Sequence, residues 1–264
     1  MDVLRACSLA EALALRAEHP DALPIRGGTD VMVELNFDRA RPDVILDLGG
    51  VDELGGWSRE NGTLRIGAGV TYTEIIEGEL KGALPALTEA SRTVGSPQIR
   101  NRGTIGGNLG TASPAGDALP PLLVVEADVE LAGSGGVRRL PVREFLLGPK
   151  RNALAEGELI VAVHVRPFVG AQTFMKVGPR NAMVIAVCSL AVAVDRDGDE
   201  VRASFGSAGP VPGFVRVPLA EADSLPEAVV EAASPIDDVR GTAAYRRHAL
   251  GVLARRGLER CLVA

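Results

Sequence analysis

The chain has few aromatic residues and only three cysteines. Phe, Trp and Tyr together make up 3% of 264 residues, so a planar ligand has few rings to stack against, and the core must be mostly Leu, Val, Ala and Ile. Cys7, Cys188 and Cys261 are scattered, and no two of them have the spacing of a zinc site or an iron–sulfur cluster. This usage is typical of a reduced compartment and predicts no metal on this chain.

Long apolar runs and an excess of positive charge are also missing. The longest candidate segment, 182–194, is shorter than the roughly 18 residues that a membrane helix needs, and it contains Ser189. The N-terminal residues do not resemble a secretory signal. A net charge of -6 argues against nucleic acid as the main partner. We therefore expect a cytoplasmic globular protein.

No familiar catalytic pattern is present. His19, His164 and His248 lie far apart in the sequence, without partners at metal-ligand spacing. No Ser–His–Asp or Cys–His arrangement can be argued from the sequence. The chain lacks both G-x-G-x-x-G after a first strand and the Gly-Lys-Ser/Thr of a phosphate-binding P-loop. We assign no catalytic residue and no metal ligand.

Glycine, by contrast, is abundant, with 31 residues, and one glycine pair follows an apolar run. In residues 24–31, PIRGGTDV, this run leads through Gly27 and Gly28 into an expected helix. The N–H groups and the dipole at a helix N-terminus favour a phosphate. Read alone, the segment fits an ordinary strand-to-helix turn equally well.

A second glycine-rich segment, residues 101–117, reads NRGTIGGNLGTASPAGD. Its glycines let backbone N–H groups approach a ligand, and its Thr and Asn side chains add donors. This chemistry suits a diphosphate, with the Asp117 carboxylate left for ribose hydroxyls. The alternative is a surface loop in which Asp117 caps the next helix. Two such segments about 75 residues apart predict one ligand held between two lobes.

Hydrophobic periodicity and turn residues outline a chain of both helices and strands. Helices are expected at 8–18, 31–35, 72–76, 84–92, 118–125 and 242–262, strands at 23–26, 44–48, 64–68 and 159–165, and hairpins at 129–140 and 184–207. The alternation of helix and strand before residue 50 favours parallel strands there. Weak linkers are expected near 48–56 and 166–171.

These motifs resemble those of the FAD-binding medium subunit of the molybdenum hydroxylases, the family of xanthine dehydrogenase and aerobic carbon monoxide dehydrogenase. The resemblance is carried by IRGGTD at 25–30 and TIGGNLGTASPAGD at 104–117. It continues through FMKVGPR at 174–180, GSAGPVP at 206–212, and SPIDDVRG at 234–241 with YRR at 245–247, and so spans nearly the whole chain.

The resemblance implies an α+β fold with a two-lobed PCMH-type FAD-binding domain over 1–168, whose lobes are 1–52 and 53–168, followed by a C-terminal domain over 169–264 with an antiparallel sheet and helices. Residues 25–31 and 104–108 would wrap the diphosphate from opposite sides, Asp117 would hold a ribose, and Ile105 would offer apolar cover for the isoalloxazine ring. The cofactor-binding residues implied are Ile25, Arg26, Gly27, Gly28, Thr29, Asp30, Val31, Val94, Thr104, Ile105, Gly106, Gly107, Asn108, Thr111, Asp117, Ile160 and Lys176.

The implied function is electron relay. The molybdenum cofactor of a large partner subunit would oxidise the substrate, and 2Fe–2S clusters of a small partner subunit would pass electrons to this FAD and on to NAD, oxygen or a quinone. A dimer of such heterotrimers is expected. Without its partners, the isolated chain should have low stability or expose an apolar patch.

Two other functions stay open on the sequence. One is a non-redox scaffold or nucleotide-binding module that kept the fold, and the other is a stand-alone flavin oxidase. The oxidase would need its own base near the flavin, which the sequence does not offer. Reduction of the flavin during turnover of the assembled complex separates electron relay from the scaffold.

Overall fold

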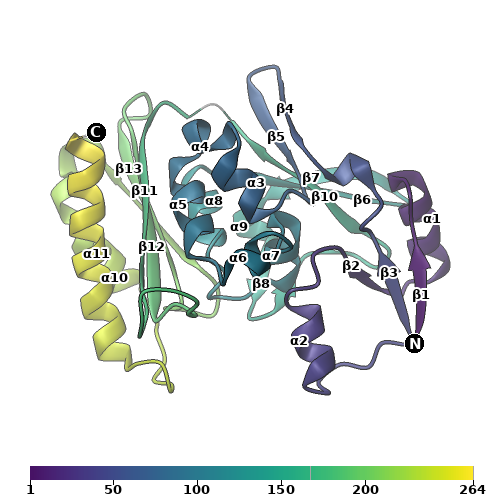
Figure 1. Ribbon diagram of the computed structural model, residues 1–264. Coiled ribbons are helices and arrows are strands. Elements are labelled where there is room, and N and C mark those ends of the chain that lie inside the picture. The colour runs from purple at the N-terminus through teal and green to yellow at the C-terminus, as the bar shows by residue number, and fades with distance from the viewer. Residues whose placement is uncertain (167, 264) are drawn as a thin grey trace.

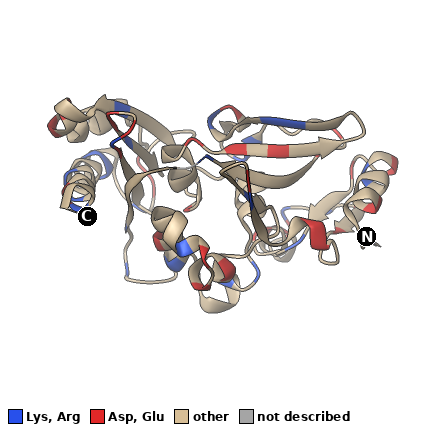
Figure 2. Cartoon of the chain, turned by 90° about the horizontal axis from the view of Figure 1, so that it is seen from above, with Lys and Arg blue, Asp and Glu red and all other residues tan. Residues whose placement is uncertain are grey.

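The structure is a computed structural model that describes residues 1–166 and 168–263. Figure 1 shows three parts in a row, with an N-terminal lobe at the right, a second lobe in the middle and a C-terminal domain at the left. Seen from above in Figure 2, acidic and basic residues are spread over all three parts. No helix among the described residues is long and apolar enough to cross a membrane.

The first lobe is a small parallel sheet with two helices. Its elements are β1 (Asp2–Arg5), α1 (Leu9–Glu18), β2 (Leu23–Ile25), α2 (Val31–Asn36) and β3 (Val44–Asp47). The strands are parallel in the order β1-β3-β2, as the alternation of helix and strand predicts. Helix α1 starts as expected, because the Ser8 side chain caps it by accepting from the Glu11 amide. Strand β1 is not among the predicted strands, since none of its residues is buried and its sequence has no apolar run.

The second lobe is built on an antiparallel sheet with the order β4-β5-β10-β6-β7. The predicted hairpin at 129–140 is confirmed as β6 and β7. The elements of the second lobe are η1 (Asp52–Leu54), β4 (Trp57–Glu60), β5 (Thr63–Gly67), α3 (Tyr72–Glu77), α4 (Leu80–Ala83), α5 (Pro85–Thr93), α6 (Pro97–Arg100), α7 (Ile105–Thr111), α8 (Leu119–Val124), β6 (Asp128–Gly133), β7 (Gly136–Pro141), α9 (Val142–Phe145), β8 (Leu146–Gly148), β9 (Arg151–Asn152) and β10 (Leu159–Val165).

The C-terminal domain is a four-stranded antiparallel sheet in chain order. Its elements are β11 (Gly170–Val177), β12 (Cys188–Asp195), β13 (Glu200–Gly206), β14 (Gly213–Pro218), η2 (Leu219–Ser224), α10 (Leu225–Ala232) and α11 (Ala243–Val263). Helices α10 and α11 cover one face of the sheet, while the other face packs on α5 and α8 of the second lobe (Figure 1). Phe174, Ala191 and Ala193 therefore belong to the core of the second lobe.

The two lobes also share a core. Ala132, Leu159 and Val161 of the second lobe pack with Leu46 of β3 and the α1 side of the first. The expected linker at 48–56 is part of this core, because it contributes Val51 and Leu54, which are fully buried. The lobes are consequently fixed to each other rather than joined by a free segment.

The glycine-rich segment 101–117 contains a helix where the sequence indicates a loop. Helix α7 begins after Thr104, whose side chain accepts from the Gly107 amide, and it ends at Ala112 in the left-handed conformation. Glycine lowers helix propensity, so the local sequence does not favour this helix. Tertiary hydrogen bonds to the β5–α3 turn hold it in place.

Candidate cofactor site

The turn between β2 and α2 leaves a run of backbone N–H groups open. Among the described residues, none accepts a hydrogen bond from the amides of 27–31. Gly28 has φ of +74°, a conformation that residues with a side chain rarely adopt. Successive N–H groups in such a turn form a concave donor site that favours anions. The structure thus gives this segment the chemistry that a phosphate requires.

The second lobe lies directly against this turn. Arg102 Nη2 donates to the Arg26 carbonyl at 2.9 Å, and Thr111 Oγ1 donates to Asp30 Oδ2 at 2.9 Å. A Cβ at Gly27 would overlap the carbonyl oxygen of Arg102, so only glycine permits this approach. The two glycine-bearing segments of separate lobes therefore face one another, as their chemistry predicts. Arg102 is not among the predicted residues, although it stands inside the second motif.

The amides of the second segment differ from expectation, because they are already used within the protein. Ile105 N donates to Val70 O at 3.0 Å and Gly106 N to Ala68 O at 2.8 Å. The amides of Gly107 and Asn108 both donate to Thr104, through its hydroxyl and its carbonyl. The first two bonds fasten α7 to the turn between β5 and α3, and the other two cap the helix itself. The open backbone donors thus come from the first lobe, while the second lobe offers side chains.

Two predicted residues have side chains committed elsewhere. The Arg26 guanidinium donates to Leu48 O at 2.7 Å and Val51 O at 2.9 Å, and burial lowers its pKa. It fastens β2 to the segment that leads from β3 into the second lobe. The Ile105 side chain is fully buried in the core, so it cannot cover a ring at the lobe junction. The Ile105 side chain therefore does not serve as that cover, and its backbone amide is also taken by the Val70 carbonyl.

Ile160 is the aliphatic side chain that lies beside α7. It is half-buried on β10, and its Cδ1 atom would lie 3.6 Å from a Cβ at Gly110. An apolar side chain at this position can contact the flat face of a ligand held between the lobes.

Asp117, Lys176 and the end of α5 form a second group of predicted residues. Lys176 Nζ of β11 lies 2.6 Å from Asp117 Oδ2 and donates to Thr93 O at 3.2 Å, next to Val94. Both charged side chains are buried. Burial raises the pKa of the Asp117 carboxyl, and the Lys176 ammonium opposes that rise. The C-terminal domain thus reaches the motif of the second lobe through a buried ion pair.

Two buried polar atoms of this region have no hydrogen-bond partner among the described residues. They are Asn108 Oδ1 and Asp117 Oδ1, and both accept hydrogen bonds. Buried acceptors are rarely left unpaired, so each indicates a donor from outside the chain. Open amides for a diphosphate, together with acceptors for hydroxyl groups, fit the requirements of a dinucleotide such as FAD.

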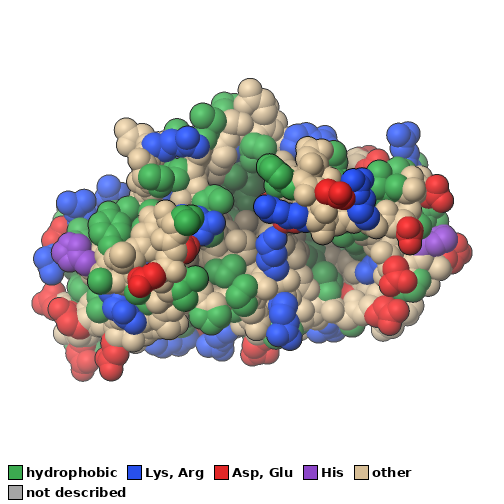
Figure 3. Space-filling model, turned by 90° about the horizontal axis from the view of Figure 1, so that it is seen from below, with side chains coloured by type: hydrophobic (Ala, Val, Ile, Leu, Met, Phe, Trp, Pro, Cys, Tyr) green, Lys and Arg blue, Asp and Glu red, His purple; other side chains and the backbone are tan. Residues whose placement is uncertain are grey.

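A hollow on the molecular surface agrees with this location. Figure 3 views the side on which α2 projects; the face is hollowed near its middle, and Lys and Arg side chains gather beside the hollow. Basic groups at such an opening favour the entry of an anionic ligand.

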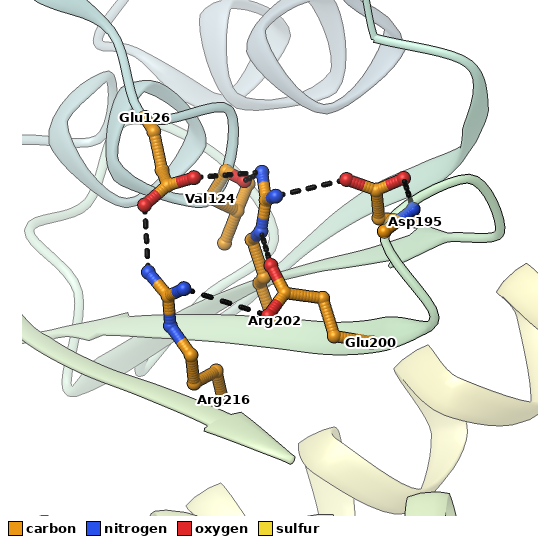
Figure 4. Close-up of polar contacts among 7 residues, drawn as sticks. Val124, Glu126, Asp195, Glu200, Arg202 and Arg216 are labelled. Atoms are coloured by element: carbon orange, nitrogen blue, oxygen red, sulfur yellow. Dashed lines mark hydrogen bonds and ion pairs between the residues drawn. The ribbon is translucent and has the colours of Figure 1, made fainter. Parts of the chain in front are cut away.

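A cavity of about 320 Å³ lies elsewhere, between α8 and the C-terminal sheet. Figure 4 shows the ion pairs on its wall, where Arg202 contacts Glu126, Asp195 and Glu200 and bridges the second lobe to the C-terminal domain. The carboxylates neutralise this arginine, so the cluster holds the two parts together and offers no phosphate site of its own.

Comparisons with known proteins agree with the geometry. Residues 1–167 match the family described as FAD binding domain in molybdopterin dehydrogenase. The xanthine dehydrogenase FAD-binding subunit of Escherichia coli O157:H7 is 32% identical, over 98% of this chain and 95% of that protein. The nicotinate dehydrogenase FAD-subunit of Eubacterium barkeri is 38% identical, over 72% of this chain and 67% of that protein.

A solved structure has the same fold throughout. A chain of the carbon monoxide dehydrogenase from Hydrogenophaga pseudoflava superposes with a TM-score of 0.90 at 28% identity, covering 100% of this chain and 97% of that chain. Fold and site together define a flavoprotein component of an oxidoreductase. The chain belongs to the family of FAD-binding domains of molybdopterin dehydrogenases.

Proposed function

We propose that this chain holds FAD between its two lobes and passes electrons from iron–sulfur clusters of a partner subunit to an acceptor such as NAD, oxygen or a quinone. The observation that carries the proposal is the row of open amides at 27–31, held against α7 by the Thr111–Asp30 hydrogen bond. When bound, FAD supplies the redox chemistry, and the protein supplies binding, orientation and electrostatics.

Each part of the site has a distinct task. The amides of 27–31 bind the diphosphate, and Asp117 accepts from ribose hydroxyls through Oδ1 while its Oδ2 stays paired with Lys176. Ile160 and Val94 give apolar contact to the ring systems, and Asn108 offers a further acceptor. None of these groups acts as an acid or base.

Partners and location follow from the same assignment. The relatives include one named as the FAD-binding subunit of a xanthine dehydrogenase, and carbon monoxide dehydrogenase medium chains. We infer a molybdenum-binding large subunit and a 2Fe–2S small subunit as partners, assembled as a dimer of heterotrimers in the cytoplasm. The domain boundary at 168/169 is part of this proposal, and it leaves the whole C-terminal sheet, which starts at Gly170, in the second domain.

The test is direct. The protein purified from a flavin-replete host is expected to be yellow, to release FAD on denaturation, and to lose its visible absorption when reduced. A colourless protein whose melting temperature does not respond to added FAD would contradict the proposal. A protein that binds ADP but keeps no flavin would instead support the non-redox alternative.

A further inference from the structure

Three residues of the C-terminal sheet lie in one row beside the segment that carries Asp117. Lys176 of β11 is paired in register with Ser189 of β12, which in turn is paired with Gly206 of β13. Directly opposed residues of neighbouring strands point to the same face of a sheet. Because Lys176 reaches Asp117 from this face, the Ser189 side chain also faces the FAD-binding domain.

The Ser189 hydroxyl is deeply buried and has no partner. The residue is 1% exposed, and its Oγ is among the buried atoms without a hydrogen bond to any described residue. A Cβ at Gly206 would lie 2.7 Å from this Oγ and 3.2 Å from Pro114 O. The missing side chain at Gly206 therefore makes the room in which the hydroxyl sits.

Other unpaired atoms lie on or beside the same segment. Asn108 Oδ1, Asp117 Oδ1, Ser189 Oγ and Ser207 Oγ are four of the six buried side-chain atoms without a partner among the described residues. Ser207 is tied to this place, because its amide donates to Pro114 O at 2.8 Å. One unpaired buried group is costly, and four around one segment indicate that polar groups from outside the chain pair with them.

We propose that Ser189 is a further cofactor-binding residue, supplied by the C-terminal domain. Its hydroxyl, seated over Gly206 and beside Lys176, hydrogen-bonds the same hydroxyl-bearing part of the dinucleotide that Asp117 receives. The C-terminal sheet therefore forms one wall of the cofactor site. This inference rests on the proposed binding of FAD.

The first test is Ser189→Ala in the full chain. FAD is added to the apoprotein, and the Kd is measured from the change in flavin fluorescence. Loss of one buried hydrogen bond to the ligand is expected to raise the Kd about tenfold. The matched control is Ser204→Ala, whose buried hydroxyl lies on the same face of the sheet but donates to Gly213 O. The control is expected to change the Kd by less than about twofold.

The second test uses Gly206→Ala and the double variant Ser189→Ala/Gly206→Ala. The added methyl group in Gly206→Ala displaces the Ser189 hydroxyl, so this single variant also binds FAD more weakly. In the double variant the hydroxyl is already gone, and the combined loss is expected to fall short of the product of the two single losses. A general loss of stability would not produce this coupling, and the melting temperature of each apoprotein measures stability separately.

The outcomes separate the two claims. If wild-type protein does not bind FAD, the proposed function fails. If wild-type protein binds FAD and Ser189→Ala binds it equally well, the Ser189 hydroxyl pairs with ordered water only and the inference alone is overturned. Should Gly206→Ala not fold, the comparison of Ser189→Ala with Ser204→Ala decides the matter.

Discussion

At the scale of single residues, the site depends on contacts that cross between the two lobes. Thr111 and Asp30 lie 81 positions apart in sequence, yet their side chains share one hydrogen bond. Arg102 adds a second crossing bond to the carbonyl of Arg26. These two bonds keep the segments that line the cofactor site close to each other.

The variant Thr111→Val tests this. Valine keeps the size of threonine but removes the donor to Asp30, so the affinity for FAD is expected to fall about fivefold, which corresponds to about 1 kcal/mol. Binding is measured by flavin fluorescence. The control Thr88→Val changes a buried threonine whose hydroxyl donates to Leu84 O at the start of its own helix. Equal affinities of Thr111→Val and wild type would show that the crossing bond plays no part in holding the cofactor.

The close approach of the two lobes depends on the absence of a side chain at Gly27. A methyl group there overlaps the Arg102 carbonyl, and backbone atoms cannot move aside as a flexible side chain can. Gly27→Ala is expected to lower the free energy of unfolding by about 1–3 kcal/mol and to weaken FAD binding more than tenfold. Urea unfolding and FAD titration measure the two effects.

Gly135→Ala is the matched control for Gly27→Ala. A Cβ at Gly135 meets no atom within 4 Å, so the substitution is expected to change stability by less than about 0.5 kcal/mol. Equal behaviour of the two variants would argue against a tight junction.

At the scale of elements, ion pairs fasten strands to the turns around them. Arg138 of β7 holds Glu158, just before β10, through two short bonds of 2.6 and 2.7 Å, and the Ala155 amide also donates to Glu158. The Arg138 hydrogen bond is the main reason that the pKa of Glu158 lies below its ordinary value. The pair joins the edge strand β7 to the central strand β10.

This pair has a defined effect on acid stability. Because the pKa of Glu158 is lowered in the folded state, the ionised carboxylate adds to the free energy of unfolding. This contribution is complete above the ordinary carboxyl pKa of about 4.3 and is lost as the pH falls below that value. Glu158→Gln is expected to lower stability at neutral pH and to flatten the loss of stability between about pH 5 and 3. Urea unfolding across this range measures it, and a pH profile identical to that of wild type would contradict the assignment.

The elements most readable from sequence are those with a local cause. Helix α1 follows from the Ser8 cap, and the hairpin of β6 and β7 follows from the glycine-rich turn between two alternating runs. Helix α7 could not be predicted, because its glycines disfavour a helix and its anchoring bonds reach the separate turn at Ala68 and Val70. The same bonds explain why the amides of Ile105 and Gly106 are not free to bind a phosphate.

At the scale of the whole molecule, the first lobe exposes apolar side chains beside the site. Helix α2 has no buried residue, and Met32, Val33 and Phe37 on or next to it are all exposed. Val33 and Phe37 are four positions apart and share one face of the helix. This exposed face agrees with the expectation that the isolated chain exposes an apolar patch.

Phe37→Ser tests whether this face serves assembly. The variant is expected to keep its melting temperature and FAD content, because Phe37 is 67% exposed. It is expected to form less complex than wild type when it is co-expressed with the two proposed partner subunits. Gel filtration measures the complex. Val137→Ser on β7 alters a side chain of the same exposure and serves as the control. If Phe37→Ser forms as much complex as wild type, this face takes no part in assembly.

The sequence by itself determined the parallel start of the chain and the two glycine-bearing segments, because these follow from local periodicity and from the chemistry of adjacent residues. The α+β fold class came from the resemblance of the sequence motifs to those of a known family. Only the tertiary structure decided which groups in those segments are free to act. The side chains of Arg26 and Ile105 are used within the protein, and the amides near Thr104 donate to other groups of the chain. The amides of 27–31 have no acceptor among the described residues. A hydrogen-bond partner that is distant in the sequence cannot be identified from the local residue pattern. Only the folded structure therefore shows which groups support the fold and which are free to bind a ligand.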